Sequence, residues 1–159
     1  MKKSLIALAC GTLALGMAEF VMMGILPDVA RDLGISIPRA GGLISAYAVG
    51  VCAGAPVTVL VARKWPLKRI LLVLSGIVVV GNLCAALSPG FWTLLAARFV
   101  SGLPHGAFFG VGSIVAERVA DPGHKTGAVS IMILGMTVAN LFCVPLGTCL
   151  SNFLSWRLA

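Results

Sequence analysis

Two ionisable residues, Glu19 and Arg98, lie deep inside long apolar stretches of this 159-residue sequence. At the centre of a lipid bilayer, an ionisable side chain costs at least about 2.5–3.5 kcal/mol, so such a residue is a candidate for function. Along helices that run in opposite directions, Glu19 and Arg98 fall roughly 22 Å and roughly 20 Å from the same membrane face. We therefore expect both side chains to face one polar cavity, in which they could pair.

A carboxyl group in such a cavity could carry protons. Apolar surroundings favour its protonated form, whereas a nearby arginine favours its ionised form. Glu19 could then load a proton while one membrane face is open and release it while the other is open. We predict that Glu19 and Arg98 perform this proton coupling; the alternative is a static buried pair that only holds two helices together.

Other side chains in the apolar stretches suit a binding cavity. His105 follows Arg98 by two helical turns and so shares its helix face. It could carry protons, contact substrate or pack as a hydrogen-bonded histidine. We predict a substrate cavity lined by Met23, Tyr47, His105 and Asn140. For the other three, the alternatives are interhelical hydrogen bonding and ordinary core or lipid contact.

Glycine and proline residues in these stretches predict helix packing and bending. Gly102, Gly106 and Gly110 follow Arg98 at four-residue intervals, which gives a flat stripe that another helix can approach closely. Pro145, with Gly147 after it, interrupts the last apolar stretch, and a proline inside a helix removes a backbone hydrogen bond and bends it. We expect these five residues to govern helix packing and gating.

The composition indicates which elements position these residues. Apolar residues make up 59% of the chain and charged residues only 11%, whereas soluble domains have about 25% charged residues. Stretches of roughly 20 apolar residues are long enough to cross a bilayer as helices. Such stretches cover about 4–26, 41–62, 70–88, 91–116 and 127–150. We predict an all-α integral membrane protein whose residues 1–159 form one partial bundle of five helices.

The first stretch has a second interpretation, as a cleaved signal peptide. Lys2 and Lys3 precede it, and small residues near Ala18 resemble a cleavage site. The apolar run continues beyond that point to Leu26, which favours a retained helix.

The distribution of Lys and Arg predicts the orientation of the chain. A cytoplasmic N-terminus places eight of these residues in cytoplasmic loops and three outside, as the positive-inside rule requires. Because the net charge of +7 is spread over short loops, we expect the lipid bilayer, and no nucleic acid, as partner.

Enzyme signatures are missing from the sequence. It contains no nucleophile–base pair, no metal-ligand spacing and no phosphate-binding loop. The five cysteines all lie in apolar stretches, where they are expected to pack as small apolar residues. We therefore predict no enzymatic activity, no catalytic residue, no metal site and no cofactor.

An internal repeat organises the five stretches. Residues 16–24 align with residues 102–110 at an offset of 86, which places Glu19 on His105. Residues of the second stretch align with the fifth at an offset of 89, which places Pro56 on Pro145. With three helices per unit, the second unit enters the membrane from the opposite side. This predicts a 3+3 inverted repeat whose second unit is incomplete.

The sequence resembles the major facilitator superfamily over its whole length. Residues 16–27 and 36–56 resemble the first two helices of its drug/sugar–proton antiporter branch, closest to the arabinose efflux permeases. Residues 98–110 resemble the fourth-helix motif of that branch. Residues 135–148, followed by Ser155-Trp156-Arg157, resemble its fifth-helix antiporter motif.

This resemblance implies export of sugars or amphipathic drugs across the bacterial inner membrane, driven by inward proton flow. It associates the residues matching Glu19 and Arg98 with coupling and substrate handling. Because the family has twelve helices, we expect an N-terminal portion of a transporter, from a truncated gene, a frameshift or an incomplete gene model. The alternative is a non-transporting membrane remnant or an interaction fragment.

The sequence departs from the family pattern at two places. In the loop of residues 63–69, Arg63 stands where the family has an acid and Pro66 where it has a glycine. We therefore expect the charge-relay latch of the family to be absent there. Cys143 stands where the family often has glycine, which predicts looser helix packing.

Overall fold

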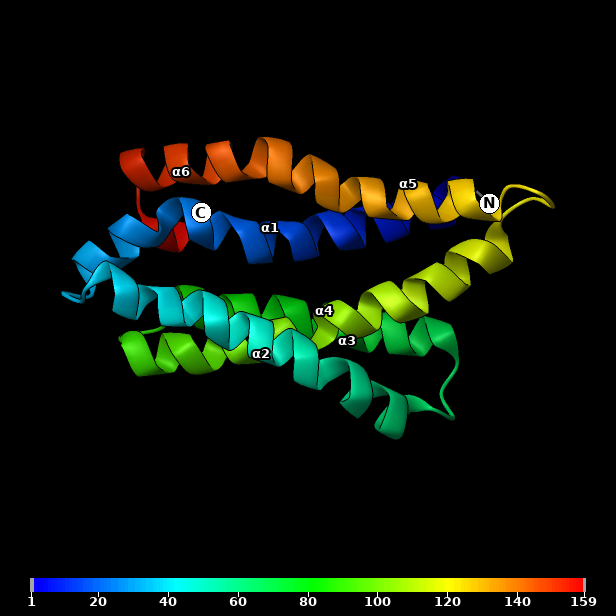
Figure 1. The fold of residues 1–159 in the computed structure, drawn as a ribbon, viewed down its shortest axis with the longest axis horizontal. Helices are drawn as coiled ribbons and strands as arrows, with labels where there is room; N and C mark the ends of the chain where they lie inside the picture. The colour runs from blue at the N-terminus through cyan, green and yellow to red at the C-terminus, as the bar shows by residue number, and fades with distance from the viewer. Residues whose placement is uncertain (1, 159) are drawn as a thin grey trace.

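Helices form almost all of the computed structural model, which describes residues 2–158 (Figure 1). The first four helices are α1 (Lys2–Asp32), α2 (Ile37–Ala62), α3 (Leu67–Ala86) and α4 (Phe91–Val119). The next is α5 (Lys125–Val138), which passes through a π-helical turn (Ala139–Cys143) into α6 (Val144–Phe153). A short 3-10 turn (Trp156–Leu158) follows. No strand occurs within residues 2–158.

Five helices of this structure are long and apolar enough to cross a membrane, α5 and α6 counting as one segment. The all-α membrane architecture predicted from the sequence is thus confirmed. The first helix ends six residues beyond the predicted apolar stretch, at Asp32. Its last turns contain Asp28 and Arg31, which are polar residues that an apolar window leaves out although they continue the helix.

Local sequence explains where several helices begin. The side chain of Ser36 accepts a hydrogen bond from the backbone N–H of Arg39 at 3.4 Å and so caps α2, as serine commonly does. Thr93 performs a similar function for α4, because its hydroxyl accepts from the backbone N–H of Gly90 at 3.3 Å. Between α1 and α2, Gly34 adopts a φ of 62°, which glycine tolerates at no steric cost.

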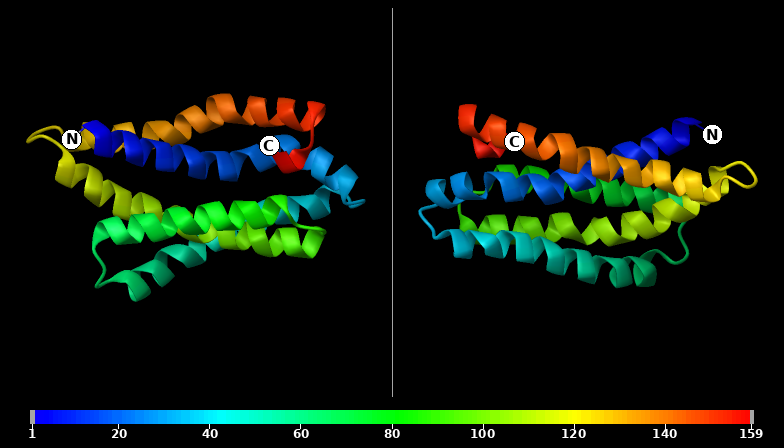
Figure 2. Two further views of the ribbon diagram at one scale, coloured as in Figure 1. Left: turned by 180° about the vertical axis from the view of Figure 1, so that it is seen from behind. Right: turned by 45° about the horizontal axis from the view of Figure 1, so that its top comes forward.

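The helices form two groups, which Figure 1 and the left view of Figure 2 separate clearly. In one group, α2 and α3 both pack along α4. In the other, α1 packs against α5 and α6. The two chain ends lie at opposite ends of the bundle (Figure 2). We call these the N-terminal end, where α1 begins, and the opposite end, where α1 finishes.

Buried apolar side chains gather in two separate clusters, one toward each end of the bundle. The first cluster includes Leu8 and Leu15 of α1 and Phe108 of α4. The second includes Val21 of α1 and Leu94 of α4. On both helices, the residues between the clusters include the polar side chains described next, so the apolar packing above and below holds them at one level.

Candidate functional site

The carboxyl group of Glu19 lies at the centre of the polar residues between the two clusters. Its Oε2 atom is 3.6 Å from Nε2 of His105 on α4. The side chain of Glu19 is 28% exposed, whereas that of His105 is only 8% exposed. Oε2 is itself buried and has no hydrogen-bond partner among the described residues. Glu19 therefore has one edge near open space and one edge against an imidazole.

The other ring nitrogen of His105 contacts α2. Its Nδ1 is 2.9 Å from the hydroxyl oxygen of Tyr47, and both side chains are buried. On its face, the imidazole stacks on Phe109 with ring centroids 5.2 Å apart. His105 is thus held by a hydrogen bond at one edge and by an aromatic ring on one face.

Arg98 lies two helical turns before His105 on α4 and is 3% exposed. Its Nη1 donates a hydrogen bond of 2.5 Å to the backbone carbonyl of Ala18 in α1. Its guanidinium carbon stands 4.4 Å from the ring centroid of Tyr47, a distance at which a cation is attracted to the ring face. Its Nε is buried without an acceptor among the described residues.

These four residues form what we call the central polar cluster: Glu19, Tyr47, Arg98 and His105. The direct pair of Glu19 with Arg98 that matching depths allowed is not found, because no ion pair within 4.0 Å joins these two described residues. Arg98 bonds instead to the carbonyl of Ala18, one residue before Glu19. Depth along two helices predicts the level of side chains, but the rotation of each helix decides which atoms meet.

The close approach of α2 to α4 explains how Tyr47 reaches this cluster. Gly102 of α4 lies directly against the carbonyl of Tyr47, so that any Cβ at position 102 would collide with it. Gly50 of α2 lies in the same way against the carbonyl of Phe99. Because both helices present glycine at their crossing, the Tyr47 ring fits between Arg98 and His105.

The predicted packing glycines are not equivalent in the structure. Gly106 continues the contact of Gly102, since a Cβ there would lie 3.4 Å from the Val51 carbonyl. Gly110 faces open space, because a Cβ at this position would have no other atom within 4 Å. The four-residue spacing therefore marks a packing stripe that ends before Gly110.

The two remaining packing candidates lie on the last membrane segment. Pro145 is in the first turn of α6, directly after the π-helical turn, and Gly147 packs against Val21 of α1. Cys143 is half-buried within the π-helical turn itself. Since proline cannot donate a backbone hydrogen bond, the wider turn before Pro145 is a local adjustment of the kind that proline induces.

Of the four predicted cavity residues, the structure brings two into the central polar cluster. Tyr47 and His105 are buried there, whereas Met23 is 50% exposed on α1 and Asn140 is exposed on the π-helical turn. A cavity of about 510 Å³ opens beside the cluster, between α1, α3, α4 and the final 3-10 turn, from which Trp156 and Arg157 line it. Arg98 and Asn82 are polar residues of its mainly apolar lining, which contains none of those four residues.

The sequence repeat has a counterpart in the packing. Gly102 contacts Tyr47, and the equivalent pair under the two offsets, Gly16 and Met136, is also in contact. Both pairs join a glycine of the first helix in a unit to the second helix in the other unit. The α1–α5 and α2–α4 crossings therefore share one register.

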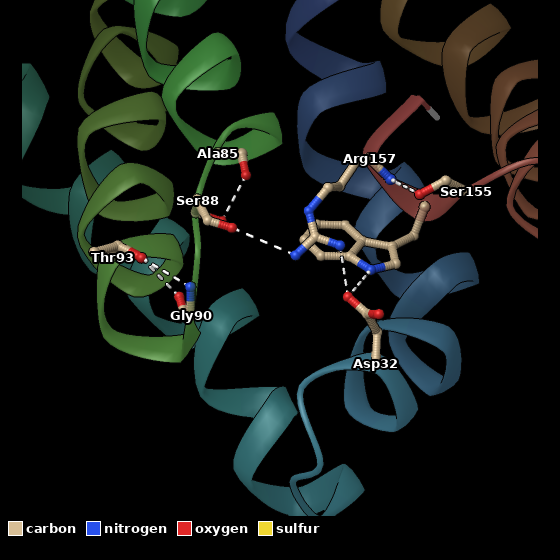
Figure 3. A network of polar contacts seen from close by, with 8 residues as sticks. Asp32, Ala85, Ser88, Gly90, Thr93, Ser155 and Arg157 are labelled. Atoms are coloured by element: carbon tan, nitrogen blue, oxygen red, sulfur yellow. Dashed lines mark hydrogen bonds and ion pairs between the residues drawn. The ribbon is translucent and has the colours of Figure 1, made fainter.

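A second polar network, at the opposite end of the bundle, was not anticipated from the sequence (Figure 3). We call it the Arg157 clasp: Asp32, Ser88, Trp156 and Arg157. The Oδ2 atom of Asp32 accepts hydrogen bonds from Trp156 Nε1 at 2.9 Å and from Arg157 Nη1 at 2.5 Å. Arg157 Nη2 donates to the Ser88 carbonyl at 3.4 Å. In the sequence, the signal for this network is a tryptophan–arginine pair after the last apolar stretch. The partners of this pair come from helices that are distant in the sequence.

Comparison with known proteins gives a family and several transporter relatives. The family model described as Major Facilitator Superfamily matches residues 8–159. The chain is 53% identical over 157 residues to "Putative transporter AraJ" of Escherichia coli (strain K12), covering 99% of this chain and 40% of that protein.

More distant relatives carry names that mention a compound or a class of compounds. The chain is 34% identical to "Chloramphenicol resistance protein" of Streptomyces lividans, over 94% of this chain and 38% of that protein. It is 32% identical to "Probable sugar efflux transporter" of Helicobacter acinonychis (strain Sheeba), over 87% of this chain and 36% of that protein. The chain thus spans about two fifths of the length of the curated relatives that it matches.

Proposed function

Because the chain belongs to the major facilitator superfamily, a family of membrane transporters and not of enzymes, we propose that it forms the N-terminal part of a proton-coupled antiporter. In this proposal the complete protein exports sugars or amphipathic drugs. It resides in the bacterial inner membrane with its N-terminus in the cytoplasm.

The arrangement of the central polar cluster carries the proposal. Glu19 is the acidic residue at mid-depth of the apolar helices, since the other four acids, Asp28, Asp32, Glu117 and Asp121, lie near helix ends. Its carboxyl group is partly exposed on one side and faces His105 on the other. A group that is open on one side and faces a buried imidazole on the other is suited to accept and release a proton as the surrounding helices move.

Arg98 supports this role as a fixed positive charge. It is held by the Ala18 carbonyl and by the face of Tyr47, so it stays close to Glu19 without neutralising it through a direct pair. When Glu19 loses its proton, the nearby guanidinium compensates the new negative charge. A directly paired arginine would instead hold Glu19 ionised in every state.

The names of two relatives support the proposed cargo. One relative is named for chloramphenicol resistance and another for sugar efflux. The cavity of about 510 Å³ is mainly apolar and has one buried guanidinium in its lining, which suits an amphipathic molecule with polar groups. The rest of the longer protein would supply the remaining walls.

The proposed orientation follows from loop charge. Four cations, Arg63, Lys64, Lys68 and Arg69, lie at the N-terminal end of the bundle, in or beside the loop between α2 and α3. Bacterial membrane proteins retain such loops in the cytoplasm.

A proteoliposome assay tests the proposed function. A full-length transporter carrying this segment is reconstituted, and chloramphenicol or arabinose is added while a trapped dye reports internal pH. We expect substrate addition to move protons across the membrane and the Glu19→Gln variant to abolish this movement. The matched control is Glu117→Gln, which alters an exposed glutamate of α4. Proton movement that persists in Glu19→Gln would show that Glu19 does not couple.

A further inference from the structure

His105 presents its two ring nitrogens to two different partners. Nδ1 is 2.9 Å from the Tyr47 hydroxyl oxygen, and Nε2 is 3.6 Å from Oε2 of Glu19. A neutral imidazole carries one hydrogen, so one nitrogen donates and the other accepts. The position of that hydrogen decides whether Glu19 faces a donor or a lone pair.

The charges at the two ends of the cluster define a preferred direction for the hydrogens at its polar contacts. The Arg98 guanidinium stands over the Tyr47 ring at 4.4 Å from its centroid. A cation at this place draws electron density from the phenol ring and makes its hydroxyl a better donor. At the other end, an ionised Glu19 can only accept. At both contacts of His105, the arrangement in which the hydrogen points away from Arg98 and toward Glu19 is therefore favoured.

We propose that Tyr47 is a positioning residue that fixes the tautomer of His105. Its hydroxyl donates to Nδ1, so that the imidazole hydrogen stays on Nε2 and points at Glu19. The purpose of this arrangement rests on the proposed function, because an Nε2–H donor stabilises the carboxylate that has released its proton. The tautomer itself is a property of the packed helices and does not depend on transport.

Among the groups around His105, Tyr47 is the one placed to fix its tautomer. Phe109 stacks on the imidazole but offers no hydrogen-bonding edge to it, with an interplanar angle of 19°. Glu19 of α1 faces Nε2, and Arg98 of α4 contacts the ring of Tyr47. Among the described residues, the hydrogen bond to Nδ1 comes from Tyr47 of α2.

Nitrogen-15 NMR of the histidine side chains tests the assignment. The 159-residue chain contains two histidines, His105 and His124, so segmental labelling of these residues in the full-length His124→Gln transporter in lipid nanodiscs leaves the signal of His105 alone. At a pH where Glu19 is ionised, we expect a single tautomer with the hydrogen on Nε2. Tyr47→Phe removes the hydroxyl and should turn this single tautomer into a mixture of two. Phe109→Leu, which removes the stacking but not the hydrogen bond, should leave the tautomer unchanged.

A second measurement avoids any change of fold. Tyr47 is the only tyrosine in the 159-residue chain, so segmental incorporation of 3-fluorotyrosine into these residues alters this one hydroxyl. Fluorine makes the phenol a stronger donor, and we expect the Nδ1 resonance to shift further in the direction of a stronger accepted hydrogen bond. An unchanged Nδ1 resonance would overturn the proposal, as would an Nδ1–H tautomer in the unsubstituted chain or an unaltered tautomer in Tyr47→Phe.

The outcomes separate this inference from the proposed function. If Glu19→Gln abolishes substrate-driven proton movement but Tyr47→Phe keeps the Nε2–H tautomer, the coupling role stands and the positioning role is wrong. If Tyr47→Phe mixes the tautomers but Glu19→Gln transports normally, the positioning role stands and the coupling role is wrong.

Discussion

Glu19 and His105 face each other at 3.6 Å from positions that are equivalent in the two units of the sequence repeat. In the predicted inverted repeat, residues related by the two-fold axis would meet where that axis crosses the structure, which agrees with this contact. The repeat places an acid on one side of the axis and an imidazole on the other.

Replacing Arg98 by lysine should weaken transport more than it weakens folding. Lysine keeps the charge, but its compact ammonium cannot both donate to the Ala18 carbonyl and cover the Tyr47 ring. A hydrogen bond to a charged group is worth about 1.5 kcal/mol, so we expect its loss to lower the export rate by up to about tenfold, the value reached when the whole loss falls on the rate-limiting step. Export from proteoliposomes by the full-length transporter measures this.

The matched control for that change is Arg118→Lys on the exposed end of α4. Its export rate should equal that of the parent protein. Equal export by Arg98→Lys and Arg118→Lys would mean that the Ala18 and Tyr47 contacts contribute nothing to transport.

Two glycine substitutions on α4 should have opposite effects on stability. Gly102→Ala introduces a Cβ that collides with the Tyr47 carbonyl, and overpacking of this kind typically costs about 1–3 kcal/mol. Gly110→Ala places a methyl group in open space and should stabilise the helix by about 0.5–1 kcal/mol. Melting temperatures in detergent measure both effects. Equal temperatures for the two variants would contradict the close α2–α4 crossing.

The membrane helices could be predicted from the sequence because apolar length alone defines them. The level of Glu19 and Arg98 could also be predicted, since it follows from counting residues along straight helices. Their contacts could not be, because a hydrogen bond from Arg98 to Ala18 depends on the rotation of both helices. That rotation is governed by close approaches such as Gly102 against Tyr47, which join residues 55 positions apart.

Other features depend on distant partners or on small backbone adjustments. The π-helical turn before Pro145 follows from a missing backbone donor, for which a proline kink is the simpler expectation. The Arg157 clasp joins Asp32 to residues 124 and 125 positions later. The sequence shows that Arg157 is a cation after the last apolar stretch, but it does not show the partners of this side chain.

Two loop prolines test the proposed orientation. Pro89 lies at the opposite end of the bundle and Pro122 at the N-terminal end, and both are exposed. In a cysteine-free background, Pro89→Cys should react with a membrane-impermeant maleimide in spheroplasts, because that end is proposed to face outward. Pro122→Cys should react only after the membrane is permeabilised. The reverse labelling pattern would place the N-terminus outside.

The Arg157 clasp should contribute a small, measurable stability. Asp32 and Arg157 have side chains that are 46% and 33% exposed, and ion pairs so open to solvent are worth about 0.2–1 kcal/mol. Asp32 nevertheless accepts two hydrogen bonds at one oxygen, from Trp156 and Arg157. Asp32→Asn and Arg157→Gln should therefore each lower the melting temperature in detergent.

The two clasp substitutions should not add when they are combined. Once Asp32→Asn has removed the charge, Arg157→Gln loses little beyond the bond to the Ser88 carbonyl. The double variant should thus melt at a higher temperature than the sum of the single effects predicts, as coupled residues do. Arg31→Gln serves as the control, because its side chain is 78% exposed and it pairs with Asp28 outside the clasp. Strict additivity of Asp32→Asn and Arg157→Gln would show that the two side chains act independently, and the clasp would not then join α1 to the end of the last membrane segment.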